Sequence, residues 1–165
     1  MPDYNLAQVH EAVEAAVGDR ECIVFRDRRL TYRDVGDRTR QLANVLTARG
    51  MGWHRDRAEL GGHESGQDHL AIYLHNGNEY LEAMVGAYKA RVAPFNVNYR
   101  YVAEELSYLL ADADARGIVF HSAFAPVLDE VRASLPDLTV LLQVADDSGN
   151  PLLDGAEWYE DALAS

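Results

Sequence analysis

The feature that most constrains this chain is a regular alternation of apolar strand-like runs and amphipathic helical runs between residues 69 and 144. Strands are predicted at 69–75, 91–97, 117–121 and 138–144, and helices at 78–90, 102–113 and 122–135. Helices of this length between consecutive strands indicate right-handed crossovers. The predicted fold class is therefore α/β, with a parallel sheet flanked by helices on both faces.

Further elements are predicted on either side of this alternation. They are a helix over 5–17, a hairpin of 21–26 and 28–30, a helix from Thr31 to Gly50, a turn at Asp146–Pro151 and one short helix over 154–164. The first helix is predicted from apolar residues at helical spacing, such as Leu6, Val9 and Val13. Thr31 and Asp34 have capping-box spacing, which marks the start of the second helix.

Length and composition limit the chain to an ordinary packed domain. Of its 165 residues, 48% are hydrophobic and 25% are charged, which excludes a disordered or fibrous chain. No internal repeat is present, so residues 1–165 are interpreted as a single α/β subdomain. Cys22 is the only cysteine, which excludes an internal disulfide, and it lies in a strand-like run where an activated thiolate is not expected.

Charge and hydropathy exclude further classes of function. Fifteen basic residues against 27 acidic ones give a formal charge of -12, which repels nucleic acid and anionic membrane surfaces. No apolar run approaches the roughly 18 residues that cross a bilayer. The start, Met1–Tyr4, lacks the basic and apolar regions of a signal peptide. A cytoplasmic location without a transmembrane segment is therefore expected.

Residues 51–68 show no periodicity and are interpreted as a long surface loop. Its length exceeds what an α/β unit normally needs between a helix and a strand, which leaves a functional loop and a tolerated insertion both open. Three histidines gather in or beside it, close to two carboxylates: His54, His63, His69, Glu64 and Asp68. None of their spacings matches a strong zinc pattern and no cysteine is near, so no metal site is predicted.

The sequence lacks the common phosphate-binding and nucleophile motifs. It has no G-x-G-x-x-G after a strand, no G-x-x-x-x-G-K-[ST] and no G-x-S-x-G. Asn76–Asn78 lies at a strand-to-helix junction where main-chain amides can face an anion, but Asn78 is interpreted as a plain helix N-cap.

A second junction, Asn98–Tyr101, carries two aromatic residues and an arginine where a predicted strand ends. Ligands of open α/β sheets bind at the carboxyl ends of strands, which makes a functional role conceivable. The favoured interpretation is structural: Tyr99 and Tyr101 cover the sheet edge, and Arg100 pairs with Glu104 one helical turn away.

Read together, several segments resemble one known family. They are Phe25, Leu30–Val35 with its helix to Gly50, Leu70–Tyr80, Gly86–Ala90, Pro94–Tyr101 and Glu104–Leu106. Their order and spacing, across about 100 residues, are similar to those at the start of adenylate-forming acyl-CoA synthetases. The run Lys89–Tyr101 and the long loop most resemble the actinobacterial fatty-acyl-CoA synthetases that activate sterol side-chain carboxylates. The wider family usually has glycine where Arg91 stands, which favours this subgroup.

The resemblance implies a ligase of fatty-acid or steroid degradation. Such enzymes join a carboxylic acid to AMP from ATP, with Mg²⁺, and pass the acyl group to CoA. The resemblance covers only the first third of such an enzyme. The family's phosphate loop, its magnesium-binding Glu, its ribose-binding Asp and its catalytic Lys all come later, and Lys89 matches an ordinary helix residue. The resemblance therefore implies no catalytic, cofactor-binding or metal-binding residue here and an inactive fragment, with ATP, Mg²⁺ and CoA used only by the full-length enzyme.

Two alternatives to a ligase fragment stay open. One is a free-standing, non-catalytic α/β module that binds a partner or small ligand, and the other is a flavodoxin-like nucleotide binder. A severed subdomain is expected to expose a large apolar face, favouring a homodimer or aggregation, whereas an independent module is expected to be polar there. The flavodoxin-like reading is disfavoured because the first strand-to-helix turn carries no phosphate loop.

Overall fold

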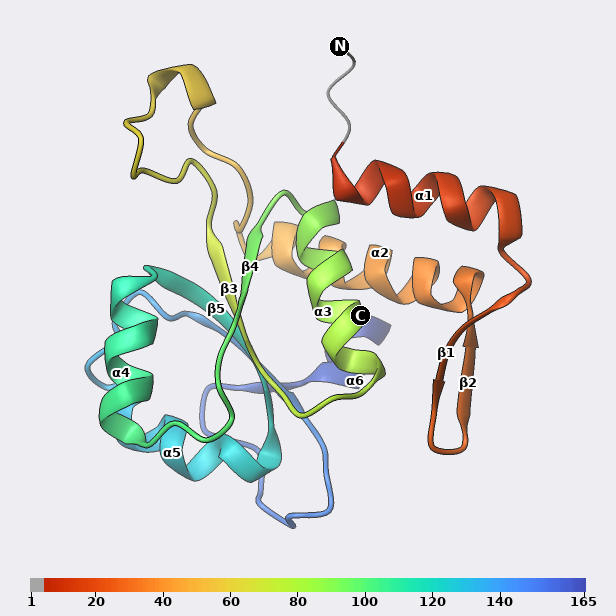
Figure 1. The fold of residues 1–165 in the computed structure, drawn as a ribbon. Helices are drawn as coiled ribbons and strands as arrows, with labels where there is room; N and C mark the ends of the chain where they lie inside the picture. Colours follow the sequence, from red (N-terminus) through yellow and green to blue (C-terminus); the bar gives the residue numbers. More distant parts are fainter. Residues whose placement is uncertain (1–4) are drawn as a thin grey trace.

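The computed structural model describes residues 5–165, and the sequence start Met1–Tyr4 lies outside them. The chain has a mixed α/β fold built on a five-stranded sheet (Figure 1). The strands are β3 (His69–Tyr73), β4 (Ala93–Asn96), β5 (Ala115–His121), β6 (Val140–Val144) and β7 (Glu157–Trp158). Their order is β4-β3-β5-β6-β7, and every neighbouring pair is parallel. The predicted α/β class with a parallel sheet is confirmed.

The C-terminal segment differs from its prediction as one short helix over 154–164. The segment first adds β7, which pairs in parallel with β6, and only then forms α6 (Tyr159–Ala164). The buried side chain of Gln143 on β6 holds the chain that leads into β7, because its Oε1 accepts a hydrogen bond from the main chain of Leu153 (2.8 Å). A strand of two residues is too short to show an alternating apolar and polar pattern in the sequence. Its formation depends on pairing with β6, which the local sequence does not reveal.

Helices cover both faces of the sheet. They are α2 (Tyr32–Ala48) and α3 (Asn78–Lys89), with α6, on one face, and α4 (Ala103–Asp112) and α5 (Ala125–Arg132) on the other. Alternate residues of β3 serve the two cores: Leu70 and Ile72 pack with α2 and α3, whereas Ala71 and Tyr73 pack with α4 and α5. All four side chains are at most 1% exposed, as expected for a central strand buried on both faces.

The N-terminal elements lie outside these layers (Figure 1). Helix α1 (Leu6–Val17) contacts α2 and α3, and the antiparallel hairpin of β1 (Glu21–Phe25) and β2 (Arg28–Thr31) leads into α2. The predicted capping box of α2 is confirmed: Thr31 Oγ1 accepts from the Asp34 N–H (3.1 Å), and the Asp34 carboxylate accepts from the Thr31 N–H (2.8 Å). Cys22, on β1, is half-buried, and burial raises the pKa of its thiol, which opposes thiolate chemistry.

Helix α1 packs through its polar side. Glu14 binds Arg40 of α2 (2.7 Å), and Glu11 pairs with Lys89 of α3. The apolar residues that predict this helix point away from the protein instead, with Leu6 61% and Val9 50% exposed. Within residues 5–165, the apolar stripe of α1 therefore has no covering element.

A buried ion network ties α2, α3 and α6 together. Its members are Arg38, Asn78, Glu82, Tyr159 and Glu160, here called the Glu82 network. The Glu82 carboxylate is fully buried and accepts two hydrogen bonds from Arg38, at 2.8 and 2.9 Å. The Tyr159 hydroxyl donates a further one at 3.1 Å, and burial together with the Glu82 charge holds the pKa of Tyr159 well above its ordinary value.

Across residues 5–165, none of the helices is both long enough and apolar enough to cross a lipid bilayer.

Candidate functional site

The candidate site is the edge of the sheet where the parallel strands end. His75 follows β3, Tyr99 follows β4, His121 ends β5 and Asp146 follows β6. Because β4, β3, β5 and β6 are neighbours in that order, the topology brings these residues to one edge. In open α/β sheets this edge is where ligands bind.

Aromatic rings gather at this edge in a group here called the carboxyl-edge cluster: His75, Tyr99, His121 and Phe124. The His75 ring is central, with ring centroids 4.9 Å from Tyr99, 4.9 Å from Phe124 and 5.7 Å from His121. Phe124 also stacks on Tyr73 of β3, with centroids 4.3 Å apart, so the cluster is anchored in the core. His75 and Tyr99 are exposed and form its solvent face.

Hydrogen bonding fixes the proton of His121. The main-chain N–H of His75 donates to Nδ1 of His121 (3.0 Å), so a neutral ring carries its proton on Nε2. Burial lowers the pKa of His121, and the carboxylate of Asp146 opposes this shift only in part. The ring is therefore held in its neutral form.

Asp146 is itself fixed by main-chain donors. Its carboxylate accepts from the N–H of Ala123 (2.8 Å) and the N–H of Ser148 (2.9 Å). Burial raises the pKa of Asp146, but the hydrogen bonds from Ser148 and Ala123 outweigh this effect and hold it below its ordinary value. The site thus offers a neutral imidazole, exposed aromatic faces and a shielded carboxylate. Such groups can stack against a flat or apolar ligand and donate one hydrogen bond.

We predict that His121 makes the protein sensitive to mild acid. Its pKa in the fold lies below the unfolded value of 6.5, so as pH falls the unfolded chain binds this proton first and stability is lost. His121→Asn keeps an acceptor for the His75 N–H and removes the titration. In urea unfolding between about pH 7.5 and 5.5, the natural protein is expected to lose more stability than this variant.

The difference in stability between the natural protein and His121→Asn is insensitive to the other histidines. Burial also lowers the pKa of His10, but His10 is present in both proteins, so its effect cancels in the difference. A stability difference that stays constant over this pH range would contradict the assignment of a half-buried, neutral His121.

The prediction of Asn78 as an N-cap is wrong. Gly77 is the cap residue, and Asn78 is the first residue of α3, 1% exposed, with its side-chain amide donating to Glu82 (2.8 Å). Arg28 of the hairpin reaches Asn78 Oδ1 (3.2 Å) and the Glu79 carboxylate (3.1 Å). The ion pair between Arg28 of the hairpin and Glu79 therefore occupies the start of α3. The two residues are far apart in the sequence, so local spacing does not reveal this pair.

The predicted pair of Arg100 and Glu104 is also not formed. Within residues 5–165, no ion pair joins the two side chains, and the Arg100 guanidinium lies over the Tyr99 ring at 5.4 Å from its centroid. Tyr101 packs against the core beside α4, whereas Tyr99 is 44% exposed, so only Tyr101 covers the sheet in the predicted way.

The histidines of the loop point to different partners. His54 Nε2 lies 2.6 Å from an Asp68 carboxylate oxygen, whereas His69 Nδ1 bonds to the main-chain oxygen of Ala113. In the described part of the chain, no three His, Cys, Asp or Glu side chains are placed to hold a metal ion. Asp68 also accepts from the Gly52 N–H (2.8 Å), and this carboxylate therefore serves to fasten the base of the loop.

His75, His121, Phe124 and Asp146 are not among the residues that the sequence motifs indicate. Each lies within three residues of a predicted strand end, so the rule that ligands bind at carboxyl ends was the available signal. The order of the strands, which brings His75 between Tyr99 and His121, was missing from the sequence pattern.

Comparison with known proteins assigns the chain to a group of enzymes. The family model described as AMP-binding enzyme matches residues 9–163. The medium-chain acyl-CoA ligase Mig of Mycobacterium avium is 56% identical over 162 residues, which are 98% of this chain and 30% of that protein. The 3-oxocholest-4-en-26-oate–CoA ligase of Rhodococcus rhodochrous is 30% identical, over 97% of this chain and 27% of its own length.

The fold has a match among solved structures. The anthranilate CoA ligase AuaEII, crystallised with anthranoyl-AMP, superposes with a TM-score of 0.80 at 20% identity. The superposition covers 98% of this chain and 28% of that one. This chain therefore spans about a third or less of the proteins it resembles, in sequence and in structure.

Proposed function

This chain belongs to the AMP-binding enzyme family, and on that premise we propose that it is the N-terminal subdomain of an ATP-dependent acyl-CoA ligase. The ligase converts a carboxylic acid and ATP to an acyl adenylate and pyrophosphate, and then transfers the acyl group to the thiol of CoA. The observation that carries the proposal is 56% identity to a medium-chain acyl-CoA ligase across nearly the whole chain. We place the protein in the cytoplasm, where ATP and CoA are available.

Medium-chain fatty acids are the proposed substrates. The relative with the steroid-acid substrate in its name is 30% identical, against 56% for the medium-chain ligase. We propose steroid side-chain carboxylates as the second substrate class, because both classes present a carboxylate on a large apolar body.

The junction at the start of α3, which most resembles an anion site, does not fit the phosphates of ATP or CoA. Its first turn carries Glu79, and Arg28 already occupies this position through its ion pair with that carboxylate (3.1 Å). The net charge of -12 adds a long-range repulsion of polyphosphates. We therefore propose that polypeptide beyond this chain binds ATP, Mg²⁺ and CoA, and that no catalytic residue lies within residues 1–165.

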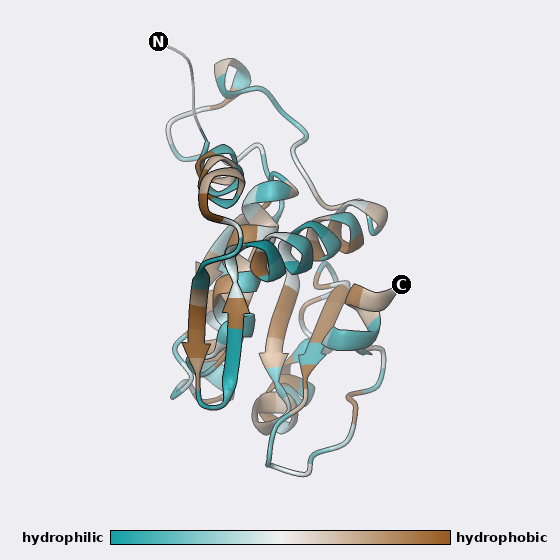
Figure 2. Cartoon of the chain, turned by 90° about the vertical axis from the view of Figure 1, so that its right-hand side faces the viewer, coloured by the Kyte–Doolittle hydropathy of each residue, from teal (hydrophilic) through white to brown (hydrophobic). Residues whose placement is uncertain are grey.

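The proposed role of this subdomain is to supply one sheet and its helices to the wall of the acyl and nucleotide pockets. The exposed apolar surface supports this role. Leu6 and Val9 on α1 and Val24 on the hairpin are each at least half exposed. Figure 2 views the molecule from the side on which α1 and the hairpin lie. An apolar surface of this kind favours contact with further polypeptide, and in its absence a homodimer.

We predict that the 165-residue chain alone does not form acyl adenylates. Adenylyl transfer depends on cations and a metal ion placed at the phosphates of ATP, and the carboxyl edge of the sheet, where ligands of such folds bind, presents aromatic rings, a neutral imidazole and a carboxylate instead. With MgATP and octanoate, a coupled assay is expected to show no pyrophosphate above a protein-free blank. The full-length ligase, assayed in parallel, is the positive control. Stoichiometric pyrophosphate from the isolated chain would contradict the assignment of catalysis to the missing regions.

The size of the native protein tests the proposal most directly. An antibody raised against residues 1–165 is used to probe a source-cell extract on a denaturing gel. A band several-fold larger than 18.4 kDa supports a ligase and directs the assays to the full-length enzyme with CoA and medium-chain acids. A band at 18.4 kDa refutes the proposal in favour of a free-standing binding module.

A further inference from the structure

The loop over residues 51–68 is closed at its base. Trp53 and Gln67 form an antiparallel bridge, and the N–H of His54 donates to the carbonyl of Gly66 (2.8 Å). The N–H of Asp68 donates to the carbonyl of Gly52 (2.9 Å). A loop fastened in this way presents its side chains in defined positions, as ligand-binding loops on rigid scaffolds do.

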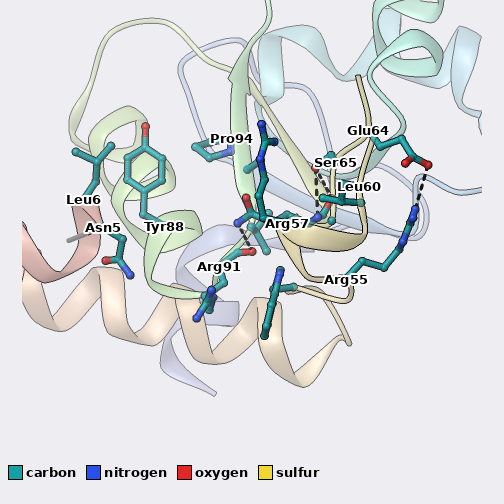
Figure 3. A pocket seen from close by; sticks show the side chains of 15 residues that line it. Asn5, Leu6, Arg55, Arg57, Leu60, Glu64, Ser65, Tyr88, Arg91 and Pro94 are labelled. Atoms are coloured by element: carbon teal, nitrogen blue, oxygen red, sulfur yellow. Dashed lines mark hydrogen bonds and ion pairs between the residues drawn. The ribbon is translucent and has the colours of Figure 1, made fainter. Parts of the chain in front are cut away.

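This loop forms one wall of a cleft of about 720 Å³ at the amino-terminal side of the sheet (Figure 3). The start of α1 and the junction between α3 and β4 form the remaining walls. A volume of this size suits a small organic molecule. The residues that matter for recognition are Leu6, Trp53, Arg57, Leu60, Arg91 and Pro94.

Arg91 occupies a backbone position that favours glycine. Its φ is +60°, in the left-handed region where a side chain strains the backbone. Two contacts nevertheless hold the residue: its guanidinium lies over the Trp53 ring at 4.6 Å from the centroid, and its carbonyl accepts a hydrogen bond from the Gln67 side chain (2.7 Å). Strain that the surrounding structure supports is often found at binding sites, which directs attention to what this guanidinium binds.

The cleft carries positive charge that nearby residues do not neutralise. Arg55 pairs with Glu64 at 3.2 Å, but within residues 5–165 neither Arg57 nor Arg91 forms an ion pair with a carboxylate. Both guanidiniums are exposed in a protein with a net charge of -12. Two uncompensated cations in one cleft favour an anionic ligand.

The same cleft offers apolar surface around these cations. Leu6 is 61% and Trp53 44% exposed. Leu60 and Pro94 line the same cleft as the two arginines, and Figure 3 shows Leu6 and Leu60 toward opposite ends of it. A simple inorganic anion would leave this apolar surface in water, and an uncharged alkyl chain would leave the guanidiniums without a partner.

We propose that the cleft formed by Trp53, Arg57 and Arg91 with Leu6, Leu60 and Pro94 binds an amphipathic organic anion, a carboxylate or phosphate on an alkyl or aryl body. Arg57 and Arg91 bind the head group, and the apolar walls cover the body. The site stands on its own geometry and needs neither ATP nor CoA, so its test is independent of the ligase assignment.

Binding is measured by fluorescence in a Trp158→Phe background, which leaves Trp53 as the only tryptophan. The probes are octanoate, octyl phosphate, 1-octanol and inorganic phosphate. Saturable binding of octanoate or octyl phosphate with a Kd below about 1 mM, and at least about tenfold tighter than 1-octanol and inorganic phosphate, is the expected result. The relative affinity of the two alkyl anions identifies the preferred head group.

Three variants locate the site. Arg91→Gly relieves backbone strain, so this variant is expected to fold, and both it and Arg57→Ala are expected to weaken octanoate binding by about tenfold or more. Arg20→Ala, an exposed arginine that does not line the cleft, removes the same charge and is expected to bind normally. Ligand-observed NMR repeats the measurement without relying on Trp53.

Four outcomes would overturn the proposal. They are no binding of either alkyl anion, equal binding of 1-octanol, equal binding of inorganic phosphate, and an affinity that Arg57→Ala and Arg91→Gly leave unchanged.

Discussion

Arg38→Ala is expected to lower the free energy of unfolding by about 3–5 kcal/mol, because it leaves the Glu82 carboxylate buried without its cation. Glu82 is 0% exposed, and two of its hydrogen bonds come from Arg38, at 2.8 and 2.9 Å. The Arg38 guanidinium is in turn held by hydrogen bonds to the carboxylates of Glu82 and Glu160. Burial alone lowers the pKa of Arg38, but hydrogen bonds to Glu160 and Glu82 raise it above its ordinary value. Urea unfolding at neutral pH measures the loss as a lower midpoint at constant slope.

A surface pair provides the matched control for Arg38. Arg29 binds Glu21 at 2.7 Å, but the two side chains are 64% and 56% exposed. Arg29→Ala is therefore expected to cost about 1 kcal/mol or less. The two variants remove the same charge and differ mainly in whether the remaining carboxylate is buried.

A double variant separates the charge from the packing. Arg38→Met with Glu82→Gln removes both charges and keeps an unbranched apolar side chain at position 38 and an isosteric one at position 82, so it is expected to be more stable than Arg38→Ala. If Arg38→Ala costs no more than Arg29→Ala, or if the double variant recovers nothing, the Glu82 network does not stabilise the fold in the way described.

This network also shows where prediction from the sequence stops. Arg38 and Glu82 are 44 residues apart, and Glu160 is 122 residues from Arg38. Periodicity correctly placed each of them in a helix or near one, since α2 and α3 are long and regular. The pairing depends on how α2, α3 and α6 pack, which no local pattern contains. The wrong predictions for Asn78 and Arg100 have the same cause. Spacing along the helix predicts a local partner for each, but Asn78 bonds to Glu82 and Arg28, and Arg100 lies over the Tyr99 ring.

The sheet can be predicted from the sequence because each strand and each connecting helix has its own pattern of apolar residues. Strands β3 to β6 are apolar runs bounded by helices, and they pair as the α/β pattern predicts. The candidate site was less accessible. His75 and His121 are 46 residues apart and meet only because β5 lies beside β3. The order β4-β3-β5 follows from tertiary packing, so the sequence indicates the edge that binds ligands but not which side chains meet there.

Gly86→Ala is expected to destabilise the protein by about 1–3 kcal/mol, although the same change in an exposed helix stabilises by up to about 1 kcal/mol. Gly86 is buried in α3 against α2. A Cβ at this position would lie 2.7 Å from Cδ2, 2.9 Å from Cγ and 3.0 Å from Cβ of Leu42. Rotating the Leu42 side chain moves the first two atoms but not its Cβ, so the helices themselves must separate.

Whether Gly86→Ala destabilises or stabilises the protein depends on the Leu42 side chain. A double-mutant cycle tests this dependence. Leu42→Ala alone is expected to cost about 2–5 kcal/mol, since Leu42 is 0% exposed and its loss leaves a cavity. In that background Gly86→Ala places a methyl group into vacated space, so its cost is expected to shrink or reverse. Urea unfolding of the four proteins gives the coupling energy. An equal cost of Gly86→Ala in both backgrounds would show that the close approach of α2 and α3 at Leu42 is not what requires glycine.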